Sequence, residues 1–338
     1  MPDAPGKIQE HRTHTMHPSE VLFQGKHKPA SLPACDHYAG SEKLMRKSLS
    51  LQQELGPVFD ITFDCEDGAA AGNEKAHAKL IAVLIAGAEN LFGRIGVRAH
   101  HLRSPFFEQD VAILCEGAAK KLAYVMVPKI ESVADAVQAC DIIDACARKH
   151  GRENLPVHML IETHGALADV KAIAALPRIE SLSFGIMDFV SEHYGAIPAE
   201  AMHSPGQFEH PLVARAKLEI AAACHAHGKV PSHNVTTEIR DAGVVVADAR
   251  KAAREFGFTR MWSIHPNQIR SIVAAFSPTD EDIEDATHIL REAQRADWAP
   301  ISHDGKLHDR ASYRYYWTVL QRARACGLPM QENAAVLI

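Results

Sequence analysis

Eight short runs rich in apolar and β-branched residues recur along the chain, and helical patterns fill the stretches between them. Most consecutive runs begin about 25 to 35 residues apart, which is the spacing of a βαβ unit. Several runs are continuously apolar rather than alternating, as is typical of parallel strands that helices cover on both faces. Few folds accommodate such a pattern. The runs lie at residues 30–36, 58–64, 94–100, 123–129, 157–163, 181–188, 229–235 and 260–266.

Two folds compete for a chain of eight βα repeats, a closed barrel and a doubly wound open sheet. No glycine-rich phosphate-binding loop follows the first run, which weakens the case for an open sheet that binds a dinucleotide. The 338 residues suffice for one barrel and an additional segment. We therefore predict an α/β fold, a (β/α)8 TIM barrel with a C-terminal helical extension.

The predicted barrel occupies residues 30–275 and contains an inserted loop at 190–211, rich in Pro, Gly and His, that we expect to overhang the C-terminal face. Residues 1–29 form a polar, His-rich N-terminal arm. Residues 276–338 form an extension with a helix-like stretch at 280–296. We expect this extension to act as a lid over a barrel mouth, either its own or that of a neighbouring subunit.

Two helical patterns are clear between the runs. One follows the fourth run, where Ser132 is a candidate N-cap and apolar residues then repeat at helical spacing as far as Ala147. Another extends from about Leu212 to Gly228. Both occupy the positions that crossover helices take between parallel strands.

Composition excludes several classes of protein. The formal net charge of −6, with no block of Lys and Arg, argues against a nucleic-acid partner. No apolar run reaches the roughly 18 residues that a membrane span needs, and the N-terminus lacks the apolar core of a signal peptide. The seven Cys are scattered and form no C-x-x-C pair, so neither a disulfide framework nor a zinc knuckle is indicated. We expect a cytoplasmic protein.

Charged residues end most of the predicted strands. In a barrel the C-terminal ends of the strands carry the chemistry, so these residues are the first candidates. A buried unpaired charge costs several kcal/mol, and such groups should therefore pair with each other or with a metal. The candidates are Asp64, Glu66, Asp67, Arg98, His100, Lys129, Glu162, Asp188 and His265.

Glu162 and Asp188 are the most distinctive pair among them. Each follows a short apolar run, in MLIET and FGIMDF, and about one βα unit separates them, which places them on neighbouring strands. Two carboxylates, completed by waters and substrate oxygens, are a usual way to hold Mg²⁺. The alternative is that both cap local backbone N–H groups, and spacing alone does not decide between the two.

Three of the other candidates also have alternative roles. The guanidinium group of Arg98 could form a bidentate pair of hydrogen bonds with a substrate carboxylate. It is equally suited to an ion pair with Glu66 or Asp67. Lys129 could form a Schiff base, but a structural or charge-balancing role is favoured because a metal would already supply the electron sink. His265 is better explained as a satisfied strand-end histidine than as a metal ligand.

These segments resemble the citrate lyase β-subunit and malyl-CoA lyase group within the HpcH/HpaI aldolase superfamily, from about residue 32 to 324. Each motif is weak alone, but seven occur in order on or beside the predicted strands. They are FDCEDG, RAHHLRSP, VPKIES, IETHGAL, SFGIMDF, TEIRD and SIHPNQI.

The resemblance implies a barrel in which Glu162 and Asp188 bind Mg²⁺. It also implies that Arg98 binds the 2-oxo acid beside the metal. SHDGKLHD resembles the family's C-terminal motif, whose aspartate reaches a neighbouring subunit as acid or base, and this implies that role for Asp304. The implied activity is Mg²⁺-dependent carbon–carbon lysis or formation of a 3-hydroxyacyl-CoA of the malyl-CoA or citryl-CoA type. The implied assembly is a homotrimer or hexamer. Further substrate contacts are assigned to Glu66, Asp67, Lys129 and His37.

The sequence departs from the family at residues 33–38, where the family has V-P-G-x-x-P and commonly holds the coenzyme A end of the substrate. His37 lies in this segment. His100 stands where the family has Asn. Three alternatives therefore stay open: a coenzyme A-independent metal aldolase for free hydroxy-oxo acids, a malyl-CoA-type thioesterase, and a non-catalytic subunit that binds a partner such as an acyl carrier protein. The intact set of candidate site residues argues against the last.

Overall fold

The structure is a computed structural model of the chain, and it describes residues 16–23 and 30–338. Most of the predicted N-terminal arm at 1–29 lies outside the described residues, including its histidines at 11, 14 and 27. The part that is described contains the short helix α1 (Pro18–Val21).

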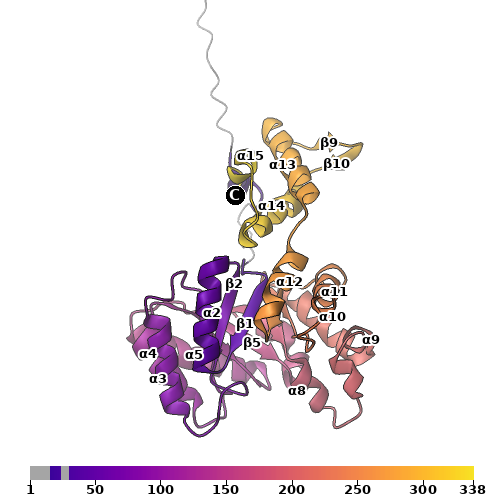
Figure 1. Cartoon of the computed structure of the whole chain (residues 1–338). Helices are drawn as coiled ribbons and strands as arrows, with labels where there is room; N and C mark the ends of the chain where they lie inside the picture. The colour runs from indigo at the N-terminus through magenta and orange to yellow at the C-terminus, as the bar shows by residue number, and fades with distance from the viewer. Residues whose placement is uncertain (1–15, 24–29) are drawn as a thin grey trace, which may run out of the picture. The chain divides into compact units, whose positions relative to one another are not determined.

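Eight parallel strands form a closed barrel in which each strand pairs with the next along the chain and β8 pairs with β1. Helices surround it (Figure 1). The predicted TIM barrel is confirmed. The strands are β1 (Cys35–Ala39), β2 (Phe59–Asp64), β3 (Ile95–Arg98), β4 (Leu122–Val127), β5 (Val157–Ile161), β6 (Ile179–Phe184), β7 (Val230–His233) and β8 (Arg260–Ser263).

The helices between the strands bury apolar faces against the outside of the barrel. Both predicted helices form, and Ser132 caps α5 by accepting the backbone N–H of Asp135. The β6–α10 connection contains a 3-10 turn (Ala199–Met202). The helices are α2 (Glu42–Leu55), α3 (Glu74–Ala86), α4 (Phe107–Ala118), α5 (Val133–Lys149), α6 (His164–Ala168), α7 (Val170–Ala175), α8 (Ile186–Ser191), α9 (Gly206–Glu209), α10 (Pro211–Ala226), α11 (Ala242–Arg254) and α12 (Pro266–Phe276).

The bounds of several predicted strands differ from those observed, and the largest differences are at β1 and β6. β1 begins at Cys35 rather than at residue 30, and Pro33, which cannot donate to a strand ladder, precedes it. β6 ends at Phe184, and residues 186–191 of the same apolar run form α8. A continuous apolar run does not show where a buried strand ends and a buried helix begins. Asp188 therefore lies in the first turn of α8 and not on the strand.

One layer of side chains inside the barrel is polar and is organised around Arg260, and a separate apolar cluster contains Met126, Leu160 and Trp262. The Arg260 side chain is fully buried, with its guanidinium 2.6 Å from Asp60 Oδ2 and 3.2 Å from Asp36 Oδ2. The hydroxyl of Tyr124 donates to Asp36 Oδ1 at 3.0 Å. Because β4 and β1 are not neighbours in the sheet, this contact crosses the barrel interior. One buried cation thus balances two buried carboxylates below the strand ends.

We expect the Arg260→Met variant to lose about 3 to 5 kcal/mol of unfolding free energy, because Asp36 and Asp60 would stay buried without their cation. Denaturant unfolding of the purified variants measures this. Arg270→Met is the matched control, since Arg270 forms an exposed ion pair with Glu54 and its loss should change stability little. Equal stability of the two variants would contradict the structural role of Arg260.

The chain divides into two compact units, and the barrel unit comprises residues 28–277 and 325–328. The other unit contains α1 and the C-terminal elements. In it, the indole N–H of Trp317 donates to the carbonyl of Leu337 at 2.9 Å. The predicted helix at 280–296 is present as α13. The elements are α13 (Asp280–Arg295), β9 (Ile301–His303), β10 (Lys306–His308), α14 (Arg310–Ala325) and α15 (Glu332–Ala335).

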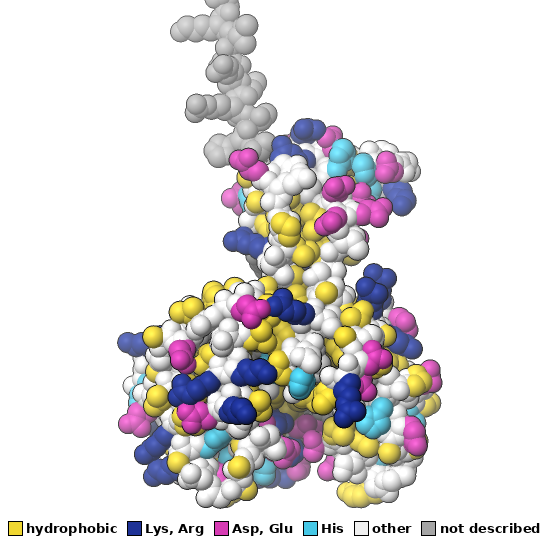
Figure 2. Space-filling model, viewed as in Figure 1, with side chains coloured by type: hydrophobic (Ala, Val, Ile, Leu, Met, Phe, Trp, Pro, Cys, Tyr) yellow, Lys and Arg dark blue, Asp and Glu magenta, His cyan; other side chains and the backbone are white. Residues whose placement is uncertain are grey.

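The surface shown in Figure 2 carries Lys and Arg side chains interspersed with Asp and Glu side chains. No single basic surface stands out on that face. Within residues 16–23 and 30–338, none of the helices combines the length and the apolar character that crossing a membrane requires.

Candidate metal and substrate site

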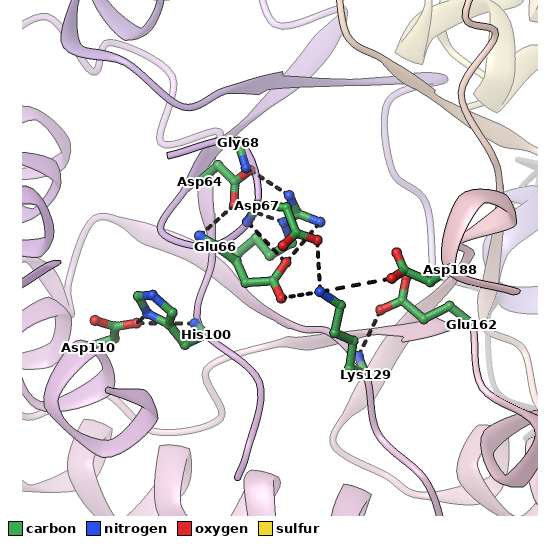
Figure 3. A network of polar contacts seen from close by, with 10 residues as sticks. Asp64, Glu66, Asp67, Gly68, His100, Asp110, Lys129, Glu162 and Asp188 are labelled. Atoms are coloured by element: carbon green, nitrogen blue, oxygen red, sulfur yellow. Dashed lines mark hydrogen bonds and ion pairs between the residues drawn. The ribbon is translucent and has the colours of Figure 1, made fainter. Parts of the chain in front are cut away.

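Acidic and basic side chains gather where strands β2 to β6 end, as Figure 3 shows. They come from segments far apart in the sequence that the parallel barrel brings to one edge. The β2–α3 loop, the end of β3, the residue pair after β4, the residue after β5 and the first turn of α8 each contribute. The sequence-predicted residues that meet here are Glu66, Asp67, Arg98, Lys129, Glu162 and Asp188.

Glu162 directly follows β5 and is only 2% exposed. Its Oε1 accepts the backbone N–H of Lys129 at 2.8 Å. Burial and the neighbouring charge of Asp188 raise the pKa of Glu162 to about 8. The two carboxylates lie beside each other in Figure 3. A buried carboxylate that faces another carboxylate is an arrangement that a divalent cation would stabilise.

Gly185 makes room for the Glu162 side chain. A Cβ atom at this position would lie 2.0 Å from Glu162 Oε2 and 2.7 Å from its Cβ. Gly185 is the N-cap residue of α8, at φ −96°, so it is the lack of a side chain rather than an unusual backbone that is needed. This glycine lies within the SFGIMDF motif, which by itself indicates no role for it. Only the side-chain packing reveals it.

Arg98 is held chiefly by Asp64, a partner that the sequence analysis did not assign. The Nε and Nη2 groups donate to the two oxygens of Asp64 at 2.8 and 2.5 Å. Nη1 lies 3.4 Å from Glu66 Oε2. Burial disfavours the charge of Arg98, but its bonds to Asp64 outweigh this and raise its pKa. The Nη1 end is thus the part of Arg98 best placed to meet a substrate carboxylate.

Asp64 also organises the loop that carries Glu66. It accepts the backbone N–H of Glu66 at 3.0 Å and that of Gly68 at 2.8 Å. A Cβ at Gly68 would lie 2.2 Å from Asp64 Oδ2, so this turn needs a glycine. Asp64 is therefore a positioning residue that fixes the plane of Arg98 and the shape of the loop.

Lys129 joins the two groups of acids. Its Nζ donates to Glu66 Oε1 at 2.7 Å and to Asp67 Oδ2 at 2.8 Å, and lies 3.9 Å from Asp188 Oδ1. Partial burial opposes the charge, but the bonds from Asp67 and Glu66 raise the pKa of Lys129 above its usual value. A protonated amine is no nucleophile, so these contacts support charge balancing over a Schiff-base role.

The donor set suits Mg²⁺. Glu162 and Asp188 offer hard oxygen ligands, and Mg²⁺ commonly binds through one or two carboxylates while it keeps waters and substrate oxygens. Within the described part of the chain, no group of three or more His, Cys, Asp or Glu residues could enclose a metal. Two carboxylates and an open coordination sphere are therefore the arrangement that this site could provide.

The three histidines near the strand ends have other partners. His37 is 2% exposed and its Nδ1 lies 3.0 Å from Ser263 Oγ. Burial lowers the pKa of His37 to about 4. His100 contacts Asp110 at 2.6 Å, and His265 caps α12. These contacts favour structural roles, and a substrate contact of His37 stays a prediction.

Asp304 lies in the other compact unit, in the two-residue turn between β9 and β10. Asp304 and Gly305 have φ values of 46° and 72°, and such a turn commonly carries Asp-Gly. The Asp304 side chain is 84% exposed. It is therefore accessible to a partner, and its role as acid or base stays a prediction.

Comparison with known proteins identifies close sequence relatives. Residues 57–266 match the family model described as HpcH/HpaI aldolase/citrate lyase. An L-malyl-CoA/beta-methylmalyl-CoA lyase from Rhodobacter capsulatus is 28% identical over 317 residues, which cover 87% of this chain and 96% of the relative. The crystal structure of a citrate lyase from Burkholderia xenovorans LB400 is 58% identical with a TM-score of 0.83, and the match covers 96% of this chain and 100% of that chain.

More distant structures share the fold. The CitE protein from Mycobacterium tuberculosis, in complex with magnesium, acetoacetate and coenzyme A, has a TM-score of 0.66 at 21% identity and covers 87% of this chain and 99% of its own. The citrate lyase beta subunit from the same organism, complexed with oxaloacetate and magnesium, has a TM-score of 0.60 at 20% identity over 73% of this chain and 98% of its own. At these identities the likeness bears on the fold alone.

Proposed function

Because the chain belongs to the HpcH/HpaI aldolase/citrate lyase family, we propose that it is a Mg²⁺-dependent carbon–carbon lyase that cleaves or forms a 3-hydroxyacyl-CoA with a 2-oxo acid. The predicted family and the predicted lyase class are confirmed by its relatives. The observation that carries the finer proposal is the buried Glu162 beside Asp188. Arg98 lies at the end of the nearby strand β3.

The named relatives support the choice of substrate class. Some are malyl-CoA lyases, and the structures from Mycobacterium tuberculosis were solved with magnesium together with coenzyme A and acetoacetate, or with oxaloacetate. We infer a substrate of the malyl-CoA or citryl-CoA type, in which a 2-oxo acid such as glyoxylate or oxaloacetate is released. The assembly proposed for this chain is a homotrimer or hexamer.

Each residue has a role in the proposed mechanism. Glu162 and Asp188 would hold Mg²⁺, which when bound supplies electrostatic stabilisation of the oxyanion that develops as the C–C bond breaks. The Nη1 end of Arg98 would neutralise the substrate carboxylate, while Asp64 keeps the guanidinium in place. A base takes the hydroxyl proton in the cleavage direction. Asp304 of a neighbouring subunit is the proposed acid that protonates the departing carbon.

The purified chain tests the function with Mg²⁺ and malyl-CoA or citryl-CoA as substrates. We expect Mg²⁺-dependent release of glyoxylate or oxaloacetate in equal amount to acetyl-CoA, measured by a coupled dehydrogenase assay and by chromatography of the thioester. Release of free coenzyme A with no 2-oxo acid would instead favour the thioesterase alternative. Absence of any product from these thioesters would contradict the lyase proposal.

The divergent segment at residues 33–38 motivates one alternative, a metal aldolase for free hydroxy-oxo acids. Calorimetric titration with coenzyme A distinguishes the two proposals. Saturable binding supports the thioester substrate. Cleavage of free hydroxy-oxo acids without any coenzyme A binding would support the alternative.

Complementation tests the proposed location of Asp304. Asp304→Asn and Asp188→Ala subunits should each be nearly inactive alone. If Asp304 serves a neighbour, equal co-assembly of the two should restore about a quarter of wild-type activity, since a quarter of subunit boundaries then join two intact halves. Turnover of the whole co-expressed mixture, without selection for mixed oligomers, measures this. A mixture as inactive as its components would contradict action between subunits.

A further inference from the structure

Lys129 stands between two acidic groups, Glu66 with Asp67 and Glu162 with Asp188 (Figure 3). Its Nζ bonds the first group at 2.7 and 2.8 Å, whereas Asp188 is 3.9 Å away. Its backbone N–H bonds Glu162 at 2.8 Å. The side chain of Lys129 is 28% exposed, so water screens these charges only in part. A single residue thus contacts every acid of the cluster except Asp64.

The charges around Lys129 do not balance. Arg98 is committed mainly to Asp64, so Lys129 is the main cation for the remaining four carboxylates. A Mg²⁺ ion has about six coordination positions and prefers to keep several for waters or substrate. If all four carboxylates reached the ion, few positions would be left for the carboxylate and carbonyl of a 2-oxo acid. Some feature of the site must therefore keep part of these four carboxylates from binding the metal.

We propose that Lys129 withholds Glu66 and Asp67 from the metal, so that Mg²⁺ is held by Glu162 and Asp188 alone and keeps positions for the substrate. This inference rests on the proposed function. Lys129 serves the site in two ways. Its main chain presents Glu162 for the metal, and its ammonium group retains the other acid pair. The site thereby binds Mg²⁺ less tightly but leaves coordination positions open for the substrate. Lys129 acts through the acids that it holds, so it is a positioning residue.

The Lys129→Met variant tests the proposal without any turnover. It keeps a Cβ atom, so the backbone at φ 52° is equally strained in both proteins. We expect its Mg²⁺ affinity, measured by calorimetric titration, to rise about tenfold or more, because two carboxylates lose their cation and turn to the metal. Oxaloacetate titrated into the Mg²⁺-loaded variant should bind about tenfold more weakly, since its coordination positions are filled and the site has lost a positive charge.

Three further variants sharpen the result. In the Lys129→Met background, Glu66→Gln with Asp67→Asn should return the Mg²⁺ affinity towards the wild-type value, because the freed ligands are then neutral amides. Lys121→Met is the matched control. Lys121 precedes β4 at its opposite end and donates to the carbonyls of Ala86 and Gly87, so Mg²⁺ affinity should not change. Lys129→Gln is titrated in parallel, and only variants that melt like the wild type are compared.

The outcomes are distinct. Unchanged or weaker Mg²⁺ binding by folded Lys129→Met and Lys129→Gln would overturn the proposal. So would a gain that persists after Glu66→Gln and Asp67→Asn, since overall charge rather than these two acids would then set the affinity. A wild-type protein that binds no Mg²⁺ would overturn the proposed function together with this inference, whereas unchanged affinity in the variants overturns this inference alone.

Discussion

Asp188→Ala should lose both bound Mg²⁺ and activity, with turnover lower by on the order of a thousandfold. The reason is that one of only two protein ligands disappears, and with it the charge stabilisation that a metal supplies, worth several kcal/mol of barrier. Folding should be preserved, because the Asp188 side chain is 41% exposed in the first turn of α8. Metal content by mass spectrometry, Mg²⁺ titration and turnover measure the effect.

Glu192→Ala is a matched control for this variant. Glu192 is an exposed acid at the C-terminal end of the same helix, and its backbone carbonyl, which accepts a bond from His164, is unaffected by the change. It should retain both metal and turnover. If Asp188→Ala kept wild-type metal content and wild-type turnover, Asp188 would be no metal ligand, and the proposed site would lose its basis.

Gly185→Ala is expected to weaken Mg²⁺ binding by about tenfold to a hundredfold, a range typical of disturbed support around a metal ligand. The added methyl carbon would lie 2.0 Å from Glu162 Oε2, well inside van der Waals contact, and would force this carboxylate to move. Both candidate ligands stay chemically intact, so the variant tests geometry alone. Mg²⁺ titration and turnover should fall together while the fold, judged by circular dichroism, is retained.

Gly243→Ala is the control for the added methyl group. Its Cβ would meet only the side chain of Asp241, the exposed N-cap residue of α11, with Oδ1 at 3.0 Å. Metal binding should be unaffected there. Wild-type Mg²⁺ affinity in Gly185→Ala would show that the position of the Glu162 carboxylate does not matter for the metal, and would contradict the geometry proposed for the site.

Much of the candidate site could be predicted from residue types and their order along the chain. Arg98, Lys129 and Glu162 each end or follow an apolar run, and parallel strands in a barrel bring such ends to one edge. Asp188 was placed on a strand and lies instead in α8. The prediction that it accompanies Glu162 did not depend on this difference, because the first turn of the helix directly continues the strand end.

Other features were not accessible from the sequence. The expected ion pair of Arg98 with Glu66 is present at 3.4 Å. Its main partner, however, is Asp64, which the sequence did not indicate, and Asp67 pairs with Lys129. Asp64, Glu66 and Asp67 lie close together in the sequence and are equivalent partners by residue type. Which one a cation meets depends on the direction of each side chain from its strand or loop, and a motif does not record that direction.

The sequence by itself determined the alternation of strands and helices and the charged residues that end the strands, because hydrophobic period and strand-end charges are local properties of the chain. That the sheet closes into a barrel is shown only by the tertiary structure. Only the tertiary structure decided how the charges are distributed. Closing the barrel brings Lys129 from the end of β4 to Glu66 after β2, and it sets Glu162 against a residue that must lack a side chain, Gly185. These contacts join segments that are remote in sequence, so packing alone establishes them.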